Sequence, residues 1–72
     1  LTRTWVFMEG PRRANSWQGV KSRDAKYIVY AKGFTEYYDL TNDPYELVNR
    51  ARDPNYASRV SAAQAALTTL RP

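Results

Sequence analysis

The sequence has 72 residues, of which eleven are Lys or Arg and seven are Asp or Glu, giving a formal net charge of +4 at pH 7. This length accommodates one small domain over residues 1–72, which buries about 60% of its unfolded surface and has a stability of about 3–5 kcal/mol. The sequence contains neither Cys nor His, which excludes disulfides, thiolate zinc sites and histidine-based chemistry within this segment.

Four segments have the composition of β-strands. Residues 4–9 are rich in β-branched and aromatic residues, residues 17–22 alternate loosely, and residues 26–31 have the clearest strand pattern of the sequence. Gly33 permits a positive φ angle in the next connection, after which residues 36–40 form the last strand. The short connections predict a four-stranded antiparallel meander.

Two Asp-Pro pairs then predict helices. The segment Asp43-Pro44-Tyr45-Glu46 has the acceptor side chain, first-turn Pro and third-position Glu of a capping box, which predicts a short helix over residues 44–50. Asp53-Pro54 repeats the pattern and predicts a helix over residues 54–70. Apolar residues at steps of four and three form one stripe on this helix, namely Tyr56, Val60, Ala63, Leu67 and Leu70. The expected fold class is α+β: the meander packs against a carboxyl-terminal α-helix that a short helical turn precedes.

The predicted strands are apolar on both faces of the sheet. In residues 26–31, Tyr27 and Val29 point to one face and Ile28 and Tyr30 to the other. Four strands span roughly 19 Å, whereas a helix with its side chains is about 10 Å wide, so one helix covers at most one face. We therefore expect the second face to contact another domain or chain. The alternative is that amphipathic Tyr rings on this face tolerate water.

The basic loop before the second strand is the best candidate for contact with a ligand. Guanidinium groups of Arg12 and Arg13 suit sulfate or phosphate, and the nearby Trp17 indole suits a sugar ring or a base. A solvated loop beside a core Trp is the simpler interpretation. The carboxylates are expected to have structural roles. Asp39 is expected to bind turn amides or a neighbouring cation. The carboxylates lack the alternating spacing of a calcium loop, so we predict no catalytic residue and no metal site within the chain.

A longer pattern resembles the sulfatases, the hydrolases of sulfate esters. Their carboxyl-terminal segment E-L-Y-D-L-x-x-D-P-x-E-x-x-N is matched by Glu36, Tyr38, Asp39, Leu40, Asp43, Pro44, Glu46 and Asn49. The preceding pattern W-x-G-V-R-T-x-x-x-K-Y-I-x-Y, followed by a Gly turn, is matched by Trp17, Gly19, Val20, Lys26, Tyr27, Ile28, Tyr30 and Gly33. The resemblance covers about residues 17–70. It departs from the pattern at Lys21, where the family often has Arg, and at Tyr37, where the family has Leu.

The resemblance implies that the chain is the carboxyl-terminal subdomain of a larger sulfatase similar to arylsulfatases and N-acetylglucosamine-6-sulfatase. Such enzymes use a formylglycine, made from the Cys or Ser of a C/S-x-P-x-R motif, and a calcium ion. Both belong to a large amino-terminal α/β domain, so the segment alone is expected to be inactive. Its start at Leu1, without Met, likewise suggests a segment of a longer polypeptide.

The same resemblance implies two partners: the amino-terminal catalytic domain of the same polypeptide, and a sulfated small molecule or glycan as the substrate of the parent enzyme. The subdomain would complete the fold and form one wall of the substrate cleft, with Arg12, Arg13 and Trp17 as candidates for its rim. By resemblance to the family, the parent enzyme is expected in the periplasm, the extracellular space or the lysosome.

Two other classes of function remain open from the residues. An exposed apolar sheet face would suit a free-standing protein-interaction module. Aromatic residues on a small basic sheet would suit single-stranded nucleic acid, but no RNP-like motif occurs, so we expect no nucleic-acid partner. The apolar runs are far shorter than the roughly 20 residues that span a bilayer, so we expect no membrane span.

Overall fold

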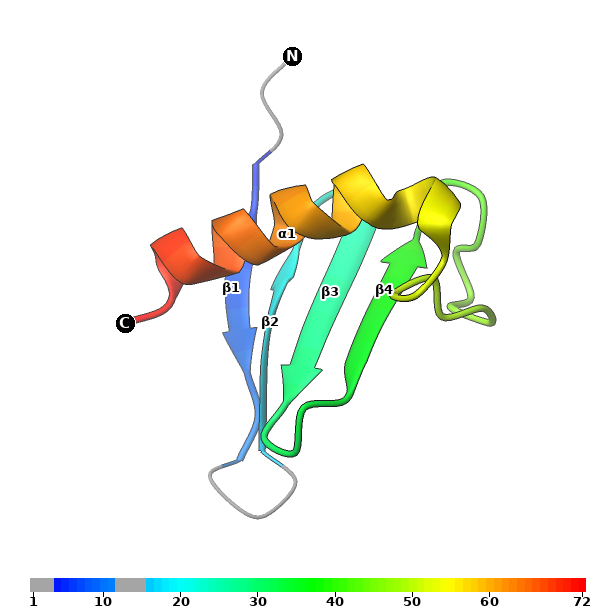
Figure 1. Ribbon diagram of the computed structural model, residues 1–72. Coiled ribbons are helices and arrows are strands. Elements are labelled where there is room, and N and C mark those ends of the chain that lie inside the picture. The colour runs from blue at the N-terminus through cyan, green and yellow to red at the C-terminus, as the bar shows by residue number, and fades with distance from the viewer. Residues whose placement is uncertain (1–3, 12–15) are drawn as a thin grey trace.

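A computed structural model describes residues 4–11 and 16–72 of the chain. Four strands form one antiparallel sheet in the order of the sequence (Figure 1). This confirms the predicted meander, and each strand begins and ends within two residues of its expected bounds. The strands are β1 (Val6–Glu9), β2 (Trp17–Lys21), β3 (Ala25–Tyr30) and β4 (Thr35–Asp39).

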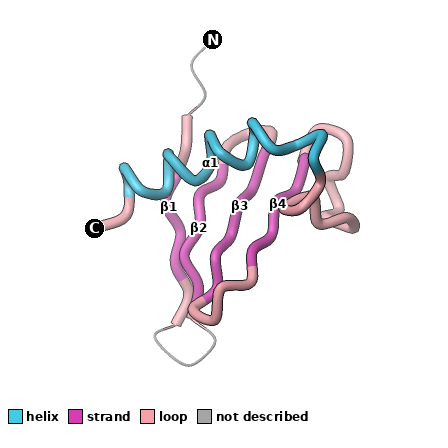
Figure 2. The backbone as a smooth tube through the Cα atoms, viewed as in Figure 1, coloured by secondary structure: helices cyan, strands magenta, loops and turns pink. Residues whose placement is uncertain are grey.

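The carboxyl-terminal helix is also confirmed. A 3-10 turn, η1 (Pro54–Tyr56), leads directly into α1 (Ala57–Leu70). The Asp53 carboxylate accepts a hydrogen bond of 2.9 Å from the Asn55 backbone amide, and Pro54 occupies the first turn, where a missing N–H costs nothing. The helix crosses the strands from the β4 side of the sheet to the β1 side (Figures 1 and 2).

The core lies between α1 and one face of the sheet. The helix contributes Val60, Ala63 and Leu67, which are the middle of the predicted apolar stripe. The sheet contributes side chains from three strands, because alternate residues of each strand point to the same face; these are Val20, Ala25, Tyr27 and Tyr37. Full burial of a large apolar side chain stabilises a fold by about 1.5–3 kcal/mol, so this cluster is the main source of stability.

The short helix predicted at residues 44–50 is wrong, because these residues form turns and extended chain. Glu46 has a φ of 57°, which lies in the left-handed region and cannot continue a right-handed helix. The Asp43 carboxylate accepts from the amides of Leu47 and Val48, both at 2.9 Å, beyond the second and third helical positions that a capping residue serves. The short helical turn before α1 is instead η1.

The end of the same loop seals the free edge of β4. The Asn49 side chain accepts a hydrogen bond from the Tyr37 amide and donates one to the Thr35 carbonyl, both at 3.0 Å. The Arg50 amide donates to the Tyr37 carbonyl at 2.8 Å. These bonds replace part of the ladder that a further strand would make, and they protect an edge that otherwise presents unpaired backbone groups.

Candidate functional site

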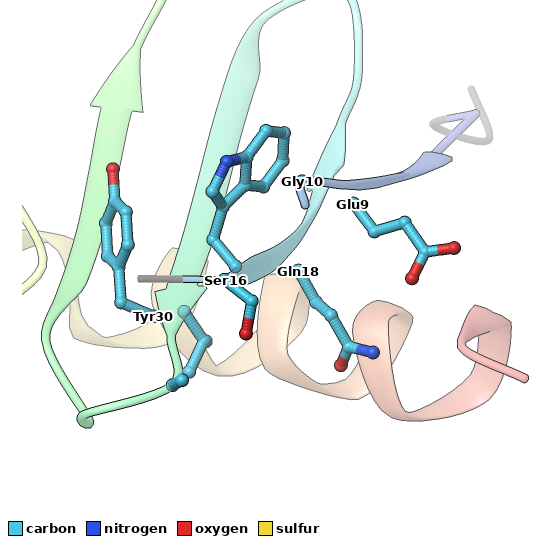
Figure 3. A pocket seen from close by; sticks show the side chains of 8 residues that line it. Glu9, Gly10, Ser16, Gln18 and Tyr30 are labelled. Carbon is cyan, nitrogen blue, oxygen red and sulfur yellow. The ribbon is translucent and has the colours of Figure 1, made fainter. Parts of the chain in front are cut away.

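A hollow of about 230 Å³ beside Trp17 contains the described part of the predicted substrate rim. Trp17 begins β2, and its indole lies against Gly10, where any Cβ would collide with the ring. Figure 3 shows Glu9, Gln18 and Tyr30 around this hollow, coming from β1, β2 and β3. Arg12 and Arg13, the other predicted rim residues, lie outside the described residues.

The hollow offers contacts for a polar ligand rather than reacting groups. The lining includes the Trp17 indole, Tyr30 and the polar side chains of Glu9 and Gln18. Trp17 and Gln18 are neighbours on β2 and point to opposite faces of the sheet. An aromatic ring with polar groups nearby suits the apolar face and the hydroxyls of a sugar. Among the described residues that line it, Glu9 is the only one with a charged side chain. No described lining residue provides a nucleophile paired with a base, so this hollow favours binding over catalysis.

Two tyrosines next to Glu36 are protonated at neutral pH. The Tyr38 hydroxyl donates to a carboxylate oxygen of Glu36 at 3.0 Å. Burial, and then this hydrogen bond, raise the pKa of Tyr38 to about 12. Burial and the Glu36 carboxylate also raise the pKa of Tyr30 above its ordinary value. Neither hydroxyl can therefore act as a base near pH 7.

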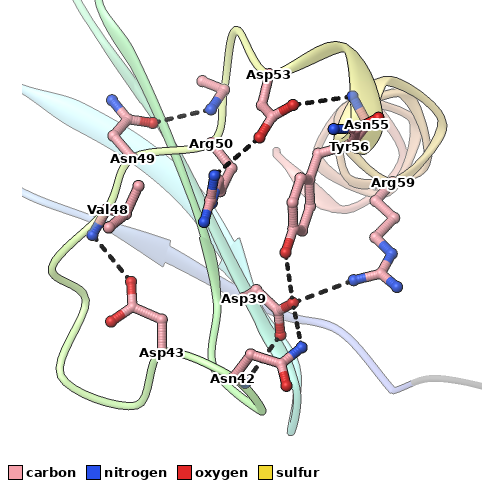
Figure 4. A network of polar contacts seen from close by, with 11 residues as sticks. Asp39, Asn42, Asp43, Val48, Asn49, Arg50, Asp53, Asn55, Tyr56 and Arg59 are labelled. Atoms are coloured by element: carbon pink, nitrogen blue, oxygen red, sulfur yellow. Dashed lines mark hydrogen bonds and ion pairs between the residues drawn. The ribbon is translucent and has the colours of Figure 1, made fainter.

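Asp39, at the end of β4, is the most heavily bonded carboxylate of the described chain. Its side chain is only 5% exposed. It accepts from the side chain and backbone amides of Asn42 at 2.9 and 3.2 Å, from the Tyr56 hydroxyl at 2.8 Å, and from the Arg59 guanidinium at 3.3 Å (Figure 4). The hydrogen bond from the Asn42 side chain is the largest cause that lowers the pKa of Asp39 to about 2, against the opposing effect of burial.

The Tyr56 ring lies near two guanidinium groups above the same carboxylate. Arg50 and Arg59 lie 5.4 and 5.1 Å from the ring centre, within the range of cation–π attraction. The hydrogen bond to Asp39 raises the pKa of Tyr56, so its hydroxyl remains a donor at neutral pH. Asp39 thus connects the end of β4 to η1 and α1. The sequence predicts turn amides or a cation as partners of Asp39, but it places Tyr56 only in the apolar stripe of the helix.

The other matched residues of the segment 36–49 also contact the fold itself. Glu46 forms an ion pair of 2.9 Å with Lys26 of β3. The Leu40 amide donates to the Asp24 carbonyl at 2.9 Å, and Pro44 lies in the turn that Asp43 and Glu46 close. Lys26 was missed as the partner of Glu46, since twenty residues separate them and no local pattern links them.

The described residues contain no group of three Asp, Glu, His or Cys side chains placed to hold a metal ion. Among them there is also no helix with the length and apolar character needed to cross a bilayer. Within this part of the chain, every buried side-chain nitrogen or oxygen has a hydrogen-bond partner. The buried Tyr37, which replaces the Leu of the sulfatase pattern, is therefore accommodated without an unpaired hydroxyl.

The sequence matches no family model and no curated protein. Among solved structures, the chain is similar to a protein from Bacteroides thetaiotaomicron VPI-5482 that is described as a "putative sulfatase", with a TM-score of 0.80 and 27% sequence identity. The similarity covers 90% of this chain and 15% of that chain. The chain thus has the fold of one small part of a much longer protein.

Proposed function

We propose that this chain is the carboxyl-terminal subdomain of a sulfatase and that it contributes to the fold of the parent enzyme. One observation carries the proposal: nearly the whole chain superimposes on a small part of the Bacteroides protein, with a TM-score of 0.80. The ordered resemblance of residues 17–70 to a carboxyl-terminal sulfatase pattern supports the same assignment and its position in the polypeptide. Sulfuric ester hydrolysis is then the activity of the parent polypeptide.

In this proposal the catalytic groups come from the rest of the polypeptide. The chain has no Cys and no S-x-P-x-R motif, so it cannot supply the precursor of a formylglycine. A calcium ion prefers several carboxylate and carbonyl oxygens at one place, and the described residues contain no such cluster. Asp39 is saturated with donors, and its low pKa makes it a poor base. Formylglycine and calcium are therefore assigned to the amino-terminal domain.

The hollow at Trp17 would form part of one wall of the substrate cleft. Its aromatic ring and polar groups suit a sugar, and Arg12 and Arg13 precede it in the sequence, where their guanidinium groups would attract sulfate. A sulfated glycan or small molecule would thus meet complementary chemistry on this side of the cleft.

The assignment is tested with the parent polypeptide and a panel of aryl sulfates and sulfated monosaccharides, with sulfate release as the readout. We expect release by the whole enzyme and its loss when the Cys or Ser of the upstream C/S-x-P-x-R motif is replaced by Ala. The corresponding phosphate esters serve as the comparison for reaction type. A parent polypeptide that lacks the motif and releases no sulfate from any of these substrates would contradict the assignment.

The cleft-wall role predicts a specific kinetic effect of the double substitution Arg12→Ala and Arg13→Ala in the parent enzyme. Loss of two cations that meet the bound anion should raise KM by about tenfold and change kcat much less, because these groups bind the ground state and transition state alike. Arg52→Ala, which removes an exposed Arg from the loop after β4, is the matched control. An unchanged KM for every hydrolysed sulfate ester would reject this role.

A further inference from the structure

The face of the sheet turned away from α1 presents a continuous set of partly apolar side chains. The strand register aligns Val6, Lys21, Lys26 and Tyr38 in one row across all four strands. The neighbouring row begins with Met8 and passes through Gly19 to Ile28. We call this surface the open face. Ile28 is only 6% exposed yet lies outside the core cluster beneath α1, which is expected for a residue on this opposite face.

The open face is hollowed at its β1 side. Val6 is 60% exposed and lines a hollow of about 300 Å³ together with Thr4, Met8, Lys21 and Ser22. At the centre of the face, Gly19 leaves room for the Ile28 side chain, whose Cγ1 lies 3.2 Å from the place where a Cβ of Gly19 would stand. The face therefore has a relief into which side chains of another surface can fit.

A rigid apolar loop flanks the other side of the open face. Tyr45 and Leu47 are 82% and 80% exposed, although loop tips are usually polar. The Asp43 carboxylate holds the amide of Leu47, and Glu46, with its left-handed backbone, forms an ion pair with Lys26 on the open face itself. We call residues 45–48 the apolar tip. Because the backbone of the tip is already fixed, binding through it costs little conformational entropy.

We propose that the open face and the apolar tip together form the surface on which the catalytic domain of the parent polypeptide packs; this inference rests on the proposed function. The matched Bacteroides chain extends far beyond the 15% that this fold covers, so a large domain of the same polypeptide is the expected neighbour. Two pairs of polar groups on this surface contact each other, Lys26 with Glu46 and Tyr38 with Glu36. Glu36 receives only a neutral hydroxyl, and Lys21 forms no ion pair with another described residue, so the covering domain must give these two charges partners or leave them at the solvated rim of the interface.

Because these 72 residues contain no Cys, a cysteine introduced here lies on a peptide without any other thiol, and its labelling can be measured separately in the parent polypeptide. Leu47→Cys probes the apolar tip and Val6→Cys probes the open face, while Ala62→Cys places the control thiol on the exposed side of α1. Each variant is treated with a maleimide under native conditions, and labelling is quantified on the peptide that carries the new thiol. Labelling after unfolding in urea normalises the rate of each site.

Since both probe sites are more than half exposed in the subdomain itself, only an added layer can protect them. We expect native labelling at both sites to be at least about tenfold slower than at Ala62→Cys. Labelling as fast as at Ala62→Cys, in a parent that hydrolyses sulfate esters, would overturn the inference and leave the proposed function intact. Sedimentation shows whether the polypeptide is a monomer under the labelling conditions. If the thiols are protected only at concentrations at which the polypeptide self-associates, the inference is overturned and a second copy of the chain covers the surface.

A parent polypeptide that lacks the C/S-x-P-x-R motif and releases no sulfate, but still protects both thiols as a monomer, would overturn the proposed function alone. It would support an intrachain interface on this surface with a domain of another activity. Labelling and sulfate release are thus independent readouts of the two proposals.

Discussion

Asp39 shows how one carboxylate organises this fold. It is buried at the end of β4, where an unpaired charge would be costly, and its bonds to Asn42, Tyr56 and Arg59 offset that cost. The native state therefore favours the ionised carboxylate, which is the reason for its low pKa. Asp39 joins the end of β4 to η1 and α1, with partners 17 and 20 residues further along the chain, so its contribution is to stability rather than to a reaction.

The lowered pKa of Asp39 predicts that part of the free energy of unfolding is lost in acid. Because the pKa in the folded state is lowered to about 2, the contribution is present above the unfolded value of about 3.9 and is lost as the pH falls through the folded pKa. Between about pH 5 and pH 2 the free energy of unfolding should fall by on the order of 2 kcal/mol from this group. Asp39→Asn should cost about 1–3 kcal/mol at pH 7 and remove this component.

Urea unfolding at a series of pH values gives the free energy of unfolding of the native sequence and of Asp39→Asn. The difference between their pH dependences is the contribution of Asp39. Glu9→Gln, which neutralises an exposed carboxyl group at the end of β1, should leave the pH dependence almost unchanged. If Asp39→Asn loses stability in acid as steeply as the native sequence, the bonds around Asp39 do not stabilise its ionised form.

At the scale of elements, the two Asp-Pro segments show where local patterns succeed and fail. Both have an acceptor side chain followed by Pro. After Asp53 the apolar stripe continues for four turns and can be buried on the sheet, so the helix forms. After Asp43 the chain is drawn to the edge of β4 by Asn49, and Glu46 turns into the left-handed region. Capping chemistry alone did not distinguish the two, because tertiary contacts decide whether a short helix is stable.

Asn49 is predicted to be critical for the edge of β4. Asn49→Ala would leave the Tyr37 amide and the Thr35 carbonyl without their side-chain partner and should lower the free energy of unfolding by about 1–3 kcal/mol. Amide hydrogen exchange at Tyr37 should accelerate in parallel. Asn55→Ala, at an exposed position of η1, is the control and should change stability by less than about 0.5 kcal/mol. Unchanged exchange at Tyr37 would show that Asn49 does not hold this edge.

At the scale of the whole molecule, a single core on one side of a sheet coexists with an open face on the other. The core cluster is complete without further layers, and no buried side-chain polar atom of the described residues lacks a partner. Four of the six large apolar side chains that are exposed lie on the open face or the apolar tip, namely Val6, Tyr45, Leu47 and Val48. Phe34 lies in the turn between β3 and β4, and Leu70 ends α1. The core thus forms on the α1 side of the sheet, and the open face is the side that we propose packs on the rest of the polypeptide.

This organisation predicts that the 72-residue chain folds alone. A two-dimensional NMR spectrum of the isolated chain should show dispersed amide signals, and urea unfolding should be cooperative with a free energy of about 3–5 kcal/mol. Ala63→Asp, which places a carboxylate in the fully buried centre of the core, should abolish the dispersion. Collapsed, undispersed signals from the native sequence would mean that the fold depends on the parent polypeptide.

The sequence by itself determined the four strands, their antiparallel order and the terminal helix, because alternation, turn residues and the apolar stripe are local features. It also indicated that one helix leaves a sheet face uncovered. Only the tertiary structure decided which face α1 covers, how residues 43–49 turn, and that Tyr56 and Arg59 complete the bonds of Asp39. These outcomes depend on contacts between residues 12 to 37 positions apart, whose geometry no local pattern encodes.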